Sequence, residues 1–466
     1  MTDRPTWIAS DRPIARFVAR PVAQFLHVEA AGGILLLLAT VVALVWANSP
    51  WQQSYTDLWS TEAVMGVGSF EIADSLQHWV NDGLMAVFFF VVGLEIKREL
   101  VAGDLSERRD AMLPAVAAIG GMVVPAAIYM AFNLGDAGGD GWGVPMATDI
   151  AFAVGVLALL GDRVPAGAKL LLLALAIVDD IGAILVIAVF YTDDLALGWL
   201  AAAVVGLVAV AQMRRLRVWY QPVYLVAGVL VWWFTLQSGL HATIAGVALG
   251  LVTPARPLLG APQADDIADR LSTDADVTAD EVSDVSFALR ESVSVAERMG
   301  RELHPWSSYL IVPIFALANA GIPLSWDALS DAAGSAITLG VVVGLVVGKP
   351  LGVVVAVAVA VRTGLGRLPD GVTWRHVGGI GALAGIGFTV SLFISGLAFD
   401  VADRRDQAAL GVLAASVIAA ALGALVLLRA PAAAPAPTTG GSATERPGSS
   451  AETGETAPAT GTDQGR

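Results

Sequence analysis

Long apolar runs recur along most of this chain, and they constrain its fold more than any other feature of the sequence. A run of about 18 or more apolar residues is long enough to cross the hydrocarbon core of a bilayer as a helix. Only 15% of the residues are charged, against roughly 25% in a soluble globular domain, so the chain lacks the polar surface that a water-exposed fold needs. The sequence therefore predicts an all-α polytopic membrane protein.

We expect twelve membrane spans between residues 29 and 429, which form one transmembrane domain. The fourth and eighth spans are short, and the tenth is long enough to be tilted or broken. The expected spans cover approximately residues 29–48, 77–96, 112–133, 143–161, 167–191, 196–213, 219–236, 239–253, 305–322, 334–361, 377–399 and 407–429.

The basic residues give the orientation of these spans. Alternate loops, counted from the N-terminal segment 1–28, hold 24 of the 27 lysines and arginines. The other loops hold only Arg404 and Arg405, and Lys349 lies inside a span. Because basic residues accumulate on the cytoplasmic side of a membrane, we expect both termini to be cytoplasmic.

Three polar segments are not spans. Residues 49–76 form an external loop without Lys or Arg, and residues 66–73 within it are compatible with part of a small hairpin. Residues 254–303 form a cytoplasmic insertion with ten acidic residues between Asp265 and Glu297, which we interpret as a solvated, partly disordered connector. Residues 430–466 are rich in Ala, Pro, Thr, Gly and Ser, a composition typical of a disordered tail.

Charge and cysteine content exclude several classes of site. The formal net charge of −15 argues against nucleic-acid binding, which requires clustered basic residues. The chain has no cysteine, so disulfides, thiolate metal sites and cysteine nucleophiles are excluded.

Two adjacent carboxylates in the fifth span point to ion handling. Asp179 and Asp180 follow nine apolar residues and precede further apolar residues, although an ionised side chain at the bilayer centre costs about 2.5–3.5 kcal/mol. On a helix they point about 100° apart, so they can serve two partners. A single internal salt bridge accounts for one of them and not for both. We therefore predict that this pair binds a transported cation.

Other spans carry features that suggest interrupted helices. Pro145 and the pair Thr148–Asp149 lie in the fourth span, where they indicate either a broken helix or a capped helix start. Gly385-Ile-Gly387 interrupts the eleventh span. Lys349 is the one cation within a span, and it is either a fixed counter-ion for an aspartate or a residue that exchanges its own proton.

Three ionisable residues near span ends are weaker candidates. Asp82 lies toward the external end of the second span, and Glu95 lies at its cytoplasmic end among basic residues. His241 begins the eighth span, where satisfying a helix end is a sufficient explanation for it. For each of the three, a structural role is the favoured interpretation of the residue alone.

From about residue 28 to residue 429, the sequence resembles the NhaA family of Na+/H+ antiporters. The motifs that carry the resemblance are Asn81-Asp82-Gly-Leu-Met-Ala-Val-Phe-Phe, Gly93-Leu-Glu-Ile-Lys-Arg-Glu-Leu100, Ala147-Thr-Asp-Ile-Ala-Phe-Ala, Ala176-Ile-Val-Asp-Asp-Ile-Gly-Ala183, Ser238-Gly-Leu-His-Ala-Thr243, Leu303-His-Pro-Trp306, Gly348-Lys-Pro-Leu-Gly352 and Gly385-Ile-Gly-Phe-Thr389.

The resemblance implies an architecture and a set of roles. Twelve helices would contain inverted three-helix repeats, the third to fifth and the tenth to twelfth spans, with broken fourth and eleventh helices that cross. The ion- and proton-binding residues would be Asp179, Asp180 and Thr148, and the charges that compensate the ends of the broken helices would be Asp149 and Lys349. The residues assigned to an accessory cation path or to the pH response would be Asp82, Glu95 and His241.

The resemblance also implies the activity. Family members export one Na+ or Li+ for two protons, without a cofactor, in the inner membrane of prokaryotes, and they dimerise through an external hairpin that corresponds to a part of residues 49–76. The sequence departs from the family at Gly300, where an acidic residue is usual although Glu302 is near, and in the length of the acidic insertion. The pH threshold is therefore the property that transfers least.

Two other functions are compatible with intramembrane carboxylates. A Na+-coupled symporter would need polar residues for an organic solute near the ion site, and few are present. An intramembrane aspartyl protease would pair Asp149 with Asp179 or Asp180, but the chain lacks the Gly-x-Gly-Asp motif typical of such enzymes. We therefore expect a transporter, not an enzyme, in which protons and sodium compete for one site.

Overall fold

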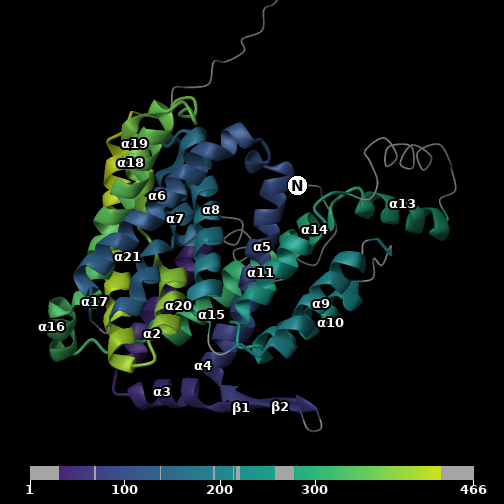
Figure 1. The fold of residues 1–466 in the computed structure, drawn as a ribbon, viewed down its shortest axis with the longest axis horizontal. Helices are drawn as coiled ribbons and strands as arrows, with labels where there is room; N and C mark the ends of the chain where they lie inside the picture. The colour runs from purple at the N-terminus through teal and green to yellow at the C-terminus, as the bar shows by residue number, and fades with distance from the viewer. Residues whose placement is uncertain are drawn as a thin grey trace, which may run out of the picture. The chain divides into compact units, whose positions relative to one another are not determined.

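The computed structural model describes residues 31–67, 70–136, 138–192, 195–213, 215–216, 221–257 and 278–431. These residues form helices almost throughout, together with one two-stranded sheet (Figure 1). The N-terminal segment 1–28 and nearly all of the tail 430–466 lie outside the described residues.

The elements follow one another along the chain in a nearly unbroken series of helices. In order they are α2 (Ala31–Ala47), α3 (Gln52–Ser60), β1 (Glu62–Val67), β2 (Phe70–Ser75), α4 (Leu76–His78), η3 (Trp79–Leu84), α5 (Met85–Ala102), η4 (Asp104–Ser106), α6 (Arg108–Asn133), η5 (Gly139–Met146), α7 (Ile150–Leu160), η6 (Gly161–Arg163), α8 (Ala166–Phe190), α9 (Leu197–Met213), α10 (Gln221–Gln237), α11 (Thr243–Val252), α13 (Ala279–Glu291), α14 (Val295–Trp306), η7 (Ser307–Ile311), α15 (Val312–Asn319), α16 (Trp326–Gly334), α17 (Ala336–Val343), η8 (Gly344–Gly348), α18 (Lys349–Arg362), α19 (Trp374–Ala384), α20 (Phe388–Ala398) and α21 (Ala402–Leu428).

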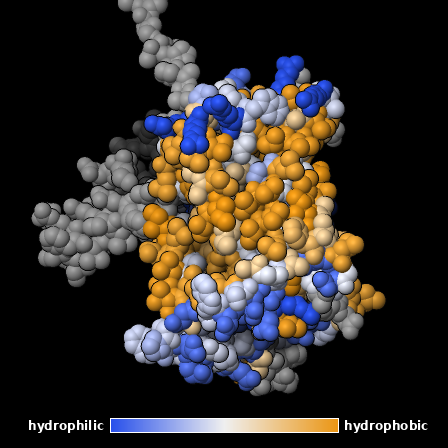
Figure 2. All heavy atoms as spheres, turned by 90° about the vertical axis from the view of Figure 1, so that its left-hand side faces the viewer, coloured by the Kyte–Doolittle hydropathy of each residue, from blue (hydrophilic) through white to orange (hydrophobic). Residues whose placement is uncertain are grey.

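Apolar side chains point outward from many of these helices. Leu38 on α2 is 56% exposed and Val205 on α9 is 68% exposed. Figure 2 shows such side chains as a broad orange band across the middle of one face, with hydrophilic side chains at both ends. An apolar exterior of this size is stable against hydrocarbon and not against water. The described chain is therefore the transmembrane part of a multi-pass membrane protein.

The number of crossings is only partly given by helix length. Five helical segments of the described chain are long and apolar enough to span a bilayer, and two bent helix pairs qualify if each pair counts as one span. The five begin at residues 111, 139, 166, 336 and 402, and the bent pairs are α2 with α3, at 113°, and α19 with α20, at 44°. A helix overlaps each of the twelve ranges expected from the sequence, but the count of twelve spans stays a prediction.

The segment between α2 and α5 contains the hairpin that the sequence suggested, in a longer form. The strands β1 and β2 pair antiparallel from Glu62 opposite Ser75 to Val67 opposite Phe70, so they extend on both sides of residues 66–73. We call the end of the molecule at which this hairpin joins α5 the hairpin side, and the other end of α5 the opposite side.

The acidic insertion is helical in its second half, whereas residues 258–277 lie outside the described residues. Its described part, from residue 278 onward, forms α13 and most of α14. The hydroxyl of Ser294 caps the start of α14 by accepting from the Glu297 N–H at 3.2 Å, and Arg298 forms an ion pair with Glu291 at 3.0 Å. These contacts explain why the chain is helical there despite its acidic composition.

Two spans are interrupted near their middle, as the sequence suggested. The first changes from the 3₁₀-helix η5 to α7 at residues 147–149, and the second changes from α19 to α20 at residues 385–387. The interruptions touch, because the Asp149 N–H donates to the Ile386 carbonyl at 2.6 Å and the Ser391 hydroxyl donates to the Val144 carbonyl at 2.7 Å. Pairing between the two breaks satisfies backbone groups that each helix leaves free.

Glycines allow two helix pairs to approach closely, and both pairs carry site residues. A Cβ atom on Gly93 of α5 would lie 2.8 Å from the Val247 carbonyl oxygen of α11. A Cβ atom on Gly120 of α6 would lie 2.5 Å from the Gly352 carbonyl oxygen of α18. Only glycine fits at such contacts, and Gly352 stands one turn after Lys349 on the same helix.

Candidate functional site

One carboxylate serves both interrupted helices where they meet. The Oδ1 atom of Asp149 accepts from the Phe152 N–H at 2.9 Å and so caps α7. Its Oδ2 atom accepts from the Thr389 N–H at 3.1 Å and from the Thr389 hydroxyl at 2.5 Å, at the start of α20. Both interpretations of this segment, a broken helix and a capped helix start, are therefore present together. Because helix N-termini carry partial positive charge, the buried Asp149 carboxylate lies where it can neutralise two of them.

Lys349 and Thr148 contact the C-terminal ends of the first halves of the broken helices, η5 and α19. The fully buried Lys349 ammonium donates to Asp179 Oδ2 at 2.7 Å and to the carbonyl of Met146, the last residue of η5. The Thr148 hydroxyl donates to the carbonyl of Ala384, the last residue of α19, at 2.8 Å. Helix C-termini carry partial negative charge, so a cation and a hydroxyl donor lie where that charge is exposed.

Asp179 and Asp180 are buried in the middle of α8 and differ in their partners. Lys349 binds Asp179, whereas in the described part of the chain no cationic side chain lies within 4.0 Å of Asp180. One oxygen of each carboxylate, Oδ1, has no hydrogen-bond partner among the described residues. Buried polar atoms are normally paired. These two oxygens are therefore the groups of the site that are able to take up a proton or a cation.

Comparison with known proteins gives the family. A family profile described as Na+/H+ antiporter 1 matches residues 23–427. The chain belongs to this family. The Na(+)/H(+) antiporter NhaA 2 of Sorangium cellulosum is 49% identical, over 91% of this chain and 93% of its own length. The Na(+)/H(+) antiporter NhaA of Rhodopirellula baltica is 49% identical, over 90% of this chain and 95% of its own length.

Two further proteins are similar to the chain. The Na(+)/H(+) antiporter NhaA 3 of Frankia alni is 47% identical, over 88% of this chain and 89% of its own length. Among solved structures, the sodium proton antiporter MjNhaP1 of Methanocaldococcus jannaschii gives a TM-score of 0.49 at 12% identity, over 88% of this chain and 98% of that chain. The relatives in the Na+/H+ antiporter 1 family are named as transporters and not as enzymes, so the protease alternative is discarded.

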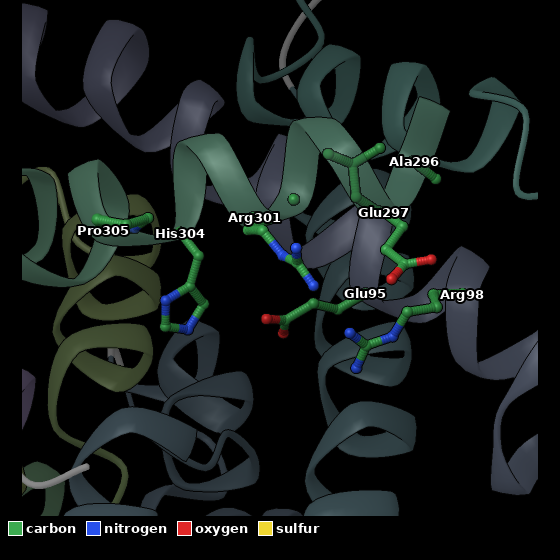
Figure 3. A pocket seen from close by; sticks show the side chains of 9 residues that line it. Glu95, Arg98, Ala296, Glu297, Arg301, His304 and Pro305 are labelled. Atoms are coloured by element: carbon green, nitrogen blue, oxygen red, sulfur yellow. The ribbon is translucent and has the colours of Figure 1, made fainter. Parts of the chain in front are cut away.

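Glu95 of this Na+/H+ antiporter 1 family member lines a cavity of about 300 Å³ between α5 and α14. Figure 3 shows the Arg301 and His304 side chains turned toward the Glu95 carboxylate, and Arg98 lines the same space. Glu95 therefore lies among basic side chains, as expected from the sequence. The cavity lies on the opposite-side half of α5, where its lining residues begin directly after Gly93, which packs against Val247 and Gly250 of α11.

The same cavity bears on the departure from the family at Gly300. Gly300 lines the cavity, so an acidic side chain at this position would point into or beside it. Glu297, one turn earlier on α14, lines the cavity as well, whereas Glu302 is not among its lining residues. The second carboxylate of the cavity is therefore Glu297, a residue to which no role was assigned from the sequence.

Asp82 and His241 form a pair at the hairpin side. Asp82 lies in the π-turn η3, and its Oδ1 atom is 3.2 Å from His241 Nε2. The other ring nitrogen of His241 lies 2.8 Å from the hydroxyl of Thr243, the first residue of α11. The expected helix-end role of His241 is thus present together with a contact that the sequence did not indicate.

Thr389 is a member of the site that sequence reasoning missed. It lay inside the motif Gly385-Ile-Gly-Phe-Thr389, but no role was assigned to it. Its hydroxyl and N–H both bind Asp149. A threonine just after a glycine interruption, at the start of an apolar run, is a helix-start signal that would have singled it out.

Proposed function

We propose that this chain is an electrogenic antiporter that exports Na+, or Li+, in exchange for protons, and that it contributes to sodium and pH homeostasis. The observation that carries the proposal is the buried pair Asp179–Asp180 beside the crossing of two interrupted helices. Each carboxylate has one oxygen without a hydrogen-bond partner among the residues that the structure describes. The names of the relatives, Na(+)/H(+) antiporters, support the choice of ions.

Competition for these carboxylates is enough to couple the two ions. Sodium is a hard cation that prefers oxygen ligands, and Asp179, Asp180 and Thr148 offer carboxylate and hydroxyl oxygens. Asp180 holds either a proton or a share of the sodium ion. At Asp179 the second proton is the one that keeps Lys349 charged, and the lysine releases it when sodium takes its place there, so loading one Na+ discharges two protons. Exchange of two protons for one Na+ moves net charge, and membrane voltage therefore drives it. No resident cofactor takes part.

Lys349 links the site to the helix ends in this mechanism. Without sodium, its ammonium holds Asp179, and sodium has to replace it there. Asp149 and Lys349 together compensate the N- and C-terminal ends of the broken helices, so that these ends tolerate a buried position. The accessory residues Asp82 and Glu95, with His241, act along the cation path or in the response to pH.

The proposed architecture has twelve spans with inverted repeats of three. Its support is a repeated order of elements: continuous α6, interrupted η5–α7 and continuous α8, and then α17–α18, interrupted α19–α20 and continuous α21. In this proposal the hairpin side is external, both termini are cytoplasmic, and the membrane is the inner membrane of a prokaryote. We also propose a homodimer through the hairpin, because β1 and β2 each keep one unpaired edge in their two-stranded sheet.

Orientation is testable with reporters fused to the chain. We expect a reporter after Ala261 and a reporter after Pro435 to be cytoplasmic, and a reporter after Glu62 to be external. The reason is that lysines and arginines are concentrated in every second loop. Paired phosphatase and fluorescent-protein fusions at each point provide the measurement. An external reporter at Ala261 would overturn both the orientation and the span count.

Deletion of residues 432–466 is expected to leave transport unchanged. Their composition, rich in Ala, Pro, Thr, Gly and Ser, lacks the apolar surface that a packed domain buries. Truncated and full-length proteins should show the same sodium-dependent proton flux in vesicles at equal protein content. A large loss of flux in a truncated protein that inserts normally would refute this expectation.

Proton flux in vesicles of purified protein tests the function itself. Addition of Na+ or Li+ to one side should drive protons to that side, and an imposed membrane voltage should change the rate if net charge moves. Flux that requires an added organic solute would instead indicate symport, and the absence of any cation-dependent flux would refute the proposal.

A further inference from the structure

Three helices are tied together by polar contacts at the hairpin side. The side-chain amides of Asn81 and Asn319 bind each other, with the Asn319 amide nitrogen 2.8 Å from the Asn81 oxygen and the reverse contact at 3.3 Å. Asp82 pairs with His241 at 3.2 Å. These contacts join η3–α5, α11 and α15, and the glycine contact at Gly93 packs α5 on α11 a few turns further in. We call these three helices the frame.

The polar contacts of the frame are partly exposed. The side chains of His241 and Asp82 are 14% and 23% exposed. The hairpin adjoins them, because the Trp79 indole, three residues before Asp82, donates to the Ala63 carbonyl of β1 at 2.9 Å. The polar contacts therefore hold the frame together without sealing it, and the barrier to ions lies deeper.

One aromatic side chain from the site helices enters the frame beneath these contacts. Phe393 of α20 is buried, and its ring centroid lies 5.5 Å from that of Phe89 on α5, 6.2 Å from that of Phe315 on α15 and 5.0 Å from the His241 ring. The ring of Phe393 thus touches all three frame helices. The contacts with Phe315 and His241 are edge to face and the contact with Phe89 is tilted, and rings packed this closely leave no room for water between them.

Phe393 lies one helical turn from the helix crossing, toward the hairpin side. It follows Thr389, which binds Asp149, by four residues on α20. Four residues on a helix rise about 6 Å. The order from the hairpin side inward is therefore the partly exposed pair Asp82–His241, the Phe393 ring, and the helix crossing.

We propose that Phe393 is the plug of a hairpin-side gate, and that its withdrawal from Phe89, Phe315 and His241 is the movement that opens the Asp179–Asp180 site to that side. The proposal rests on the proposed antiport function. An apolar constriction closes an ion path because it cannot hydrate the ion, and it reopens without breaking strong bonds. Polar contacts tie the frame helices to one another, so α20 moves relative to the frame. We call the contact surface between α20 and the frame the seam.

A cross-link across this seam tests the proposal. The chain has no cysteine of its own, so the double variant Phe315→Cys/Phe393→Cys carries the only thiols. A short bis-maleimide should join them, reduce sodium-dependent proton flux at least tenfold, and leave Na+ binding to the detergent-solubilised protein intact, because the site keeps its access from the opposite side. The two single-cysteine variants, treated with the same reagent, are the controls. Wild-type exchange by the fully cross-linked protein would overturn the gate.

Removal of the ring gives a second, independent measurement. Phe393→Ala should raise sodium-independent proton flux at least tenfold, because water then reaches the crossing from the hairpin side. Phe388→Ala removes a buried ring of the same size from the same helix. Among the described rings it meets that of Phe152 and none of the frame, so this variant should keep the sodium-independent flux of the wild type. If the double-cysteine variant fails to fold, the comparison of Phe393→Ala with Phe388→Ala still tests the proposal. Sodium-independent proton flux at the wild-type level in Phe393→Ala would overturn the role of Phe393 as the plug.

The failure of the gate is distinguishable from the failure of the antiport function. Sodium-dependent proton flux by the untreated wild-type protein supports antiport whatever the cross-link does. Absence of that flux in the wild type overturns antiport, and the gate with it, before any variant is compared.

Discussion

The variant Asp180→Asn is expected to lose sodium-dependent proton flux completely, down to the level of protein-free vesicles. An amide keeps the size and most hydrogen bonding of the carboxylate, but it cannot release a proton when sodium arrives, so competition disappears. The structure sharpens this expectation, because Asp180 has an unpartnered oxygen and, among the described residues, no cation within 4.0 Å. Insertion should survive, since removing a mid-bilayer charge lowers its cost by up to about 3 kcal/mol.

Two further variants make this result specific. Asp179→Asn should retain a part of the exchange, because Asp179 already shares one of its oxygens with Lys349 and contributes less to sodium binding. Asp327→Asn, at an exposed carboxylate in the first turn of α16, is the matched control and should exchange at the wild-type rate. Flux and calorimetric Na+ binding are compared at equal protein content. Substantial exchange by Asp180→Asn would show that the ion site lies elsewhere.

The residues of the site could be predicted from the sequence because charges within an apolar span need a reason. Asp179, Asp180 and Lys349 stand out against their neighbours without any knowledge of the fold. The two interruptions were visible for a similar reason, since Pro and Gly in an apolar run mark points where a helix ends. These signals are local, and local signals suffice to find such residues.

The pairing of these residues could not be predicted in the same way. Lys349 binds Asp179 across 170 positions of the chain, and periodicity says which face a residue occupies but not which helix lies opposite. The pair Asp82–His241 was missed for this reason, as the two residues lie on different spans. The cavity carboxylate Glu297 was missed because Glu302 is nearer to Gly300 along the sequence. Residues about one helical turn apart lie on the same face, so Glu297 and Gly300 both line the cavity.

Hydrophobic periodicity also failed to predict π-helical turns, because α-helical and π-helical segments have similar sequences. The turns η3, η7 and η8 are π-helical, and each interrupts an expected regular span. A π-turn adds one residue to a helical turn and so shifts every later side chain around the axis. Lys349 follows η8 directly, so its direction toward Asp179 depends on a feature that hydrophobic periodicity does not reveal.

The variant Lys349→Ala is expected to be strongly destabilised and to lose most of its exchange. Removal of the ammonium leaves the Asp179 carboxylate and the Met146 carbonyl buried without their partner, and breaking a buried ion pair costs about 3–5 kcal/mol. Lys349→Arg keeps the charge and should be the milder change. Thermal unfolding of purified protein in detergent, together with transport current in vesicles, provides the measurement.

The double variant Lys349→Ala/Asp179→Asn shows how much of the stability lost in Lys349→Ala comes from the broken ion pair and how much from lost packing. The amide of asparagine carries no charge, so most of the stability lost in Lys349→Ala should return in the double variant, although sodium exchange should not. The loss in Lys349→Ala should also shrink as the pH falls, because a protonated Asp179 no longer leaves an uncompensated charge in the core. If the two substitutions destabilise the protein additively, the buried pair does not stabilise the fold, and Lys349 occupies the helix crossing for its contact with the Met146 carbonyl alone.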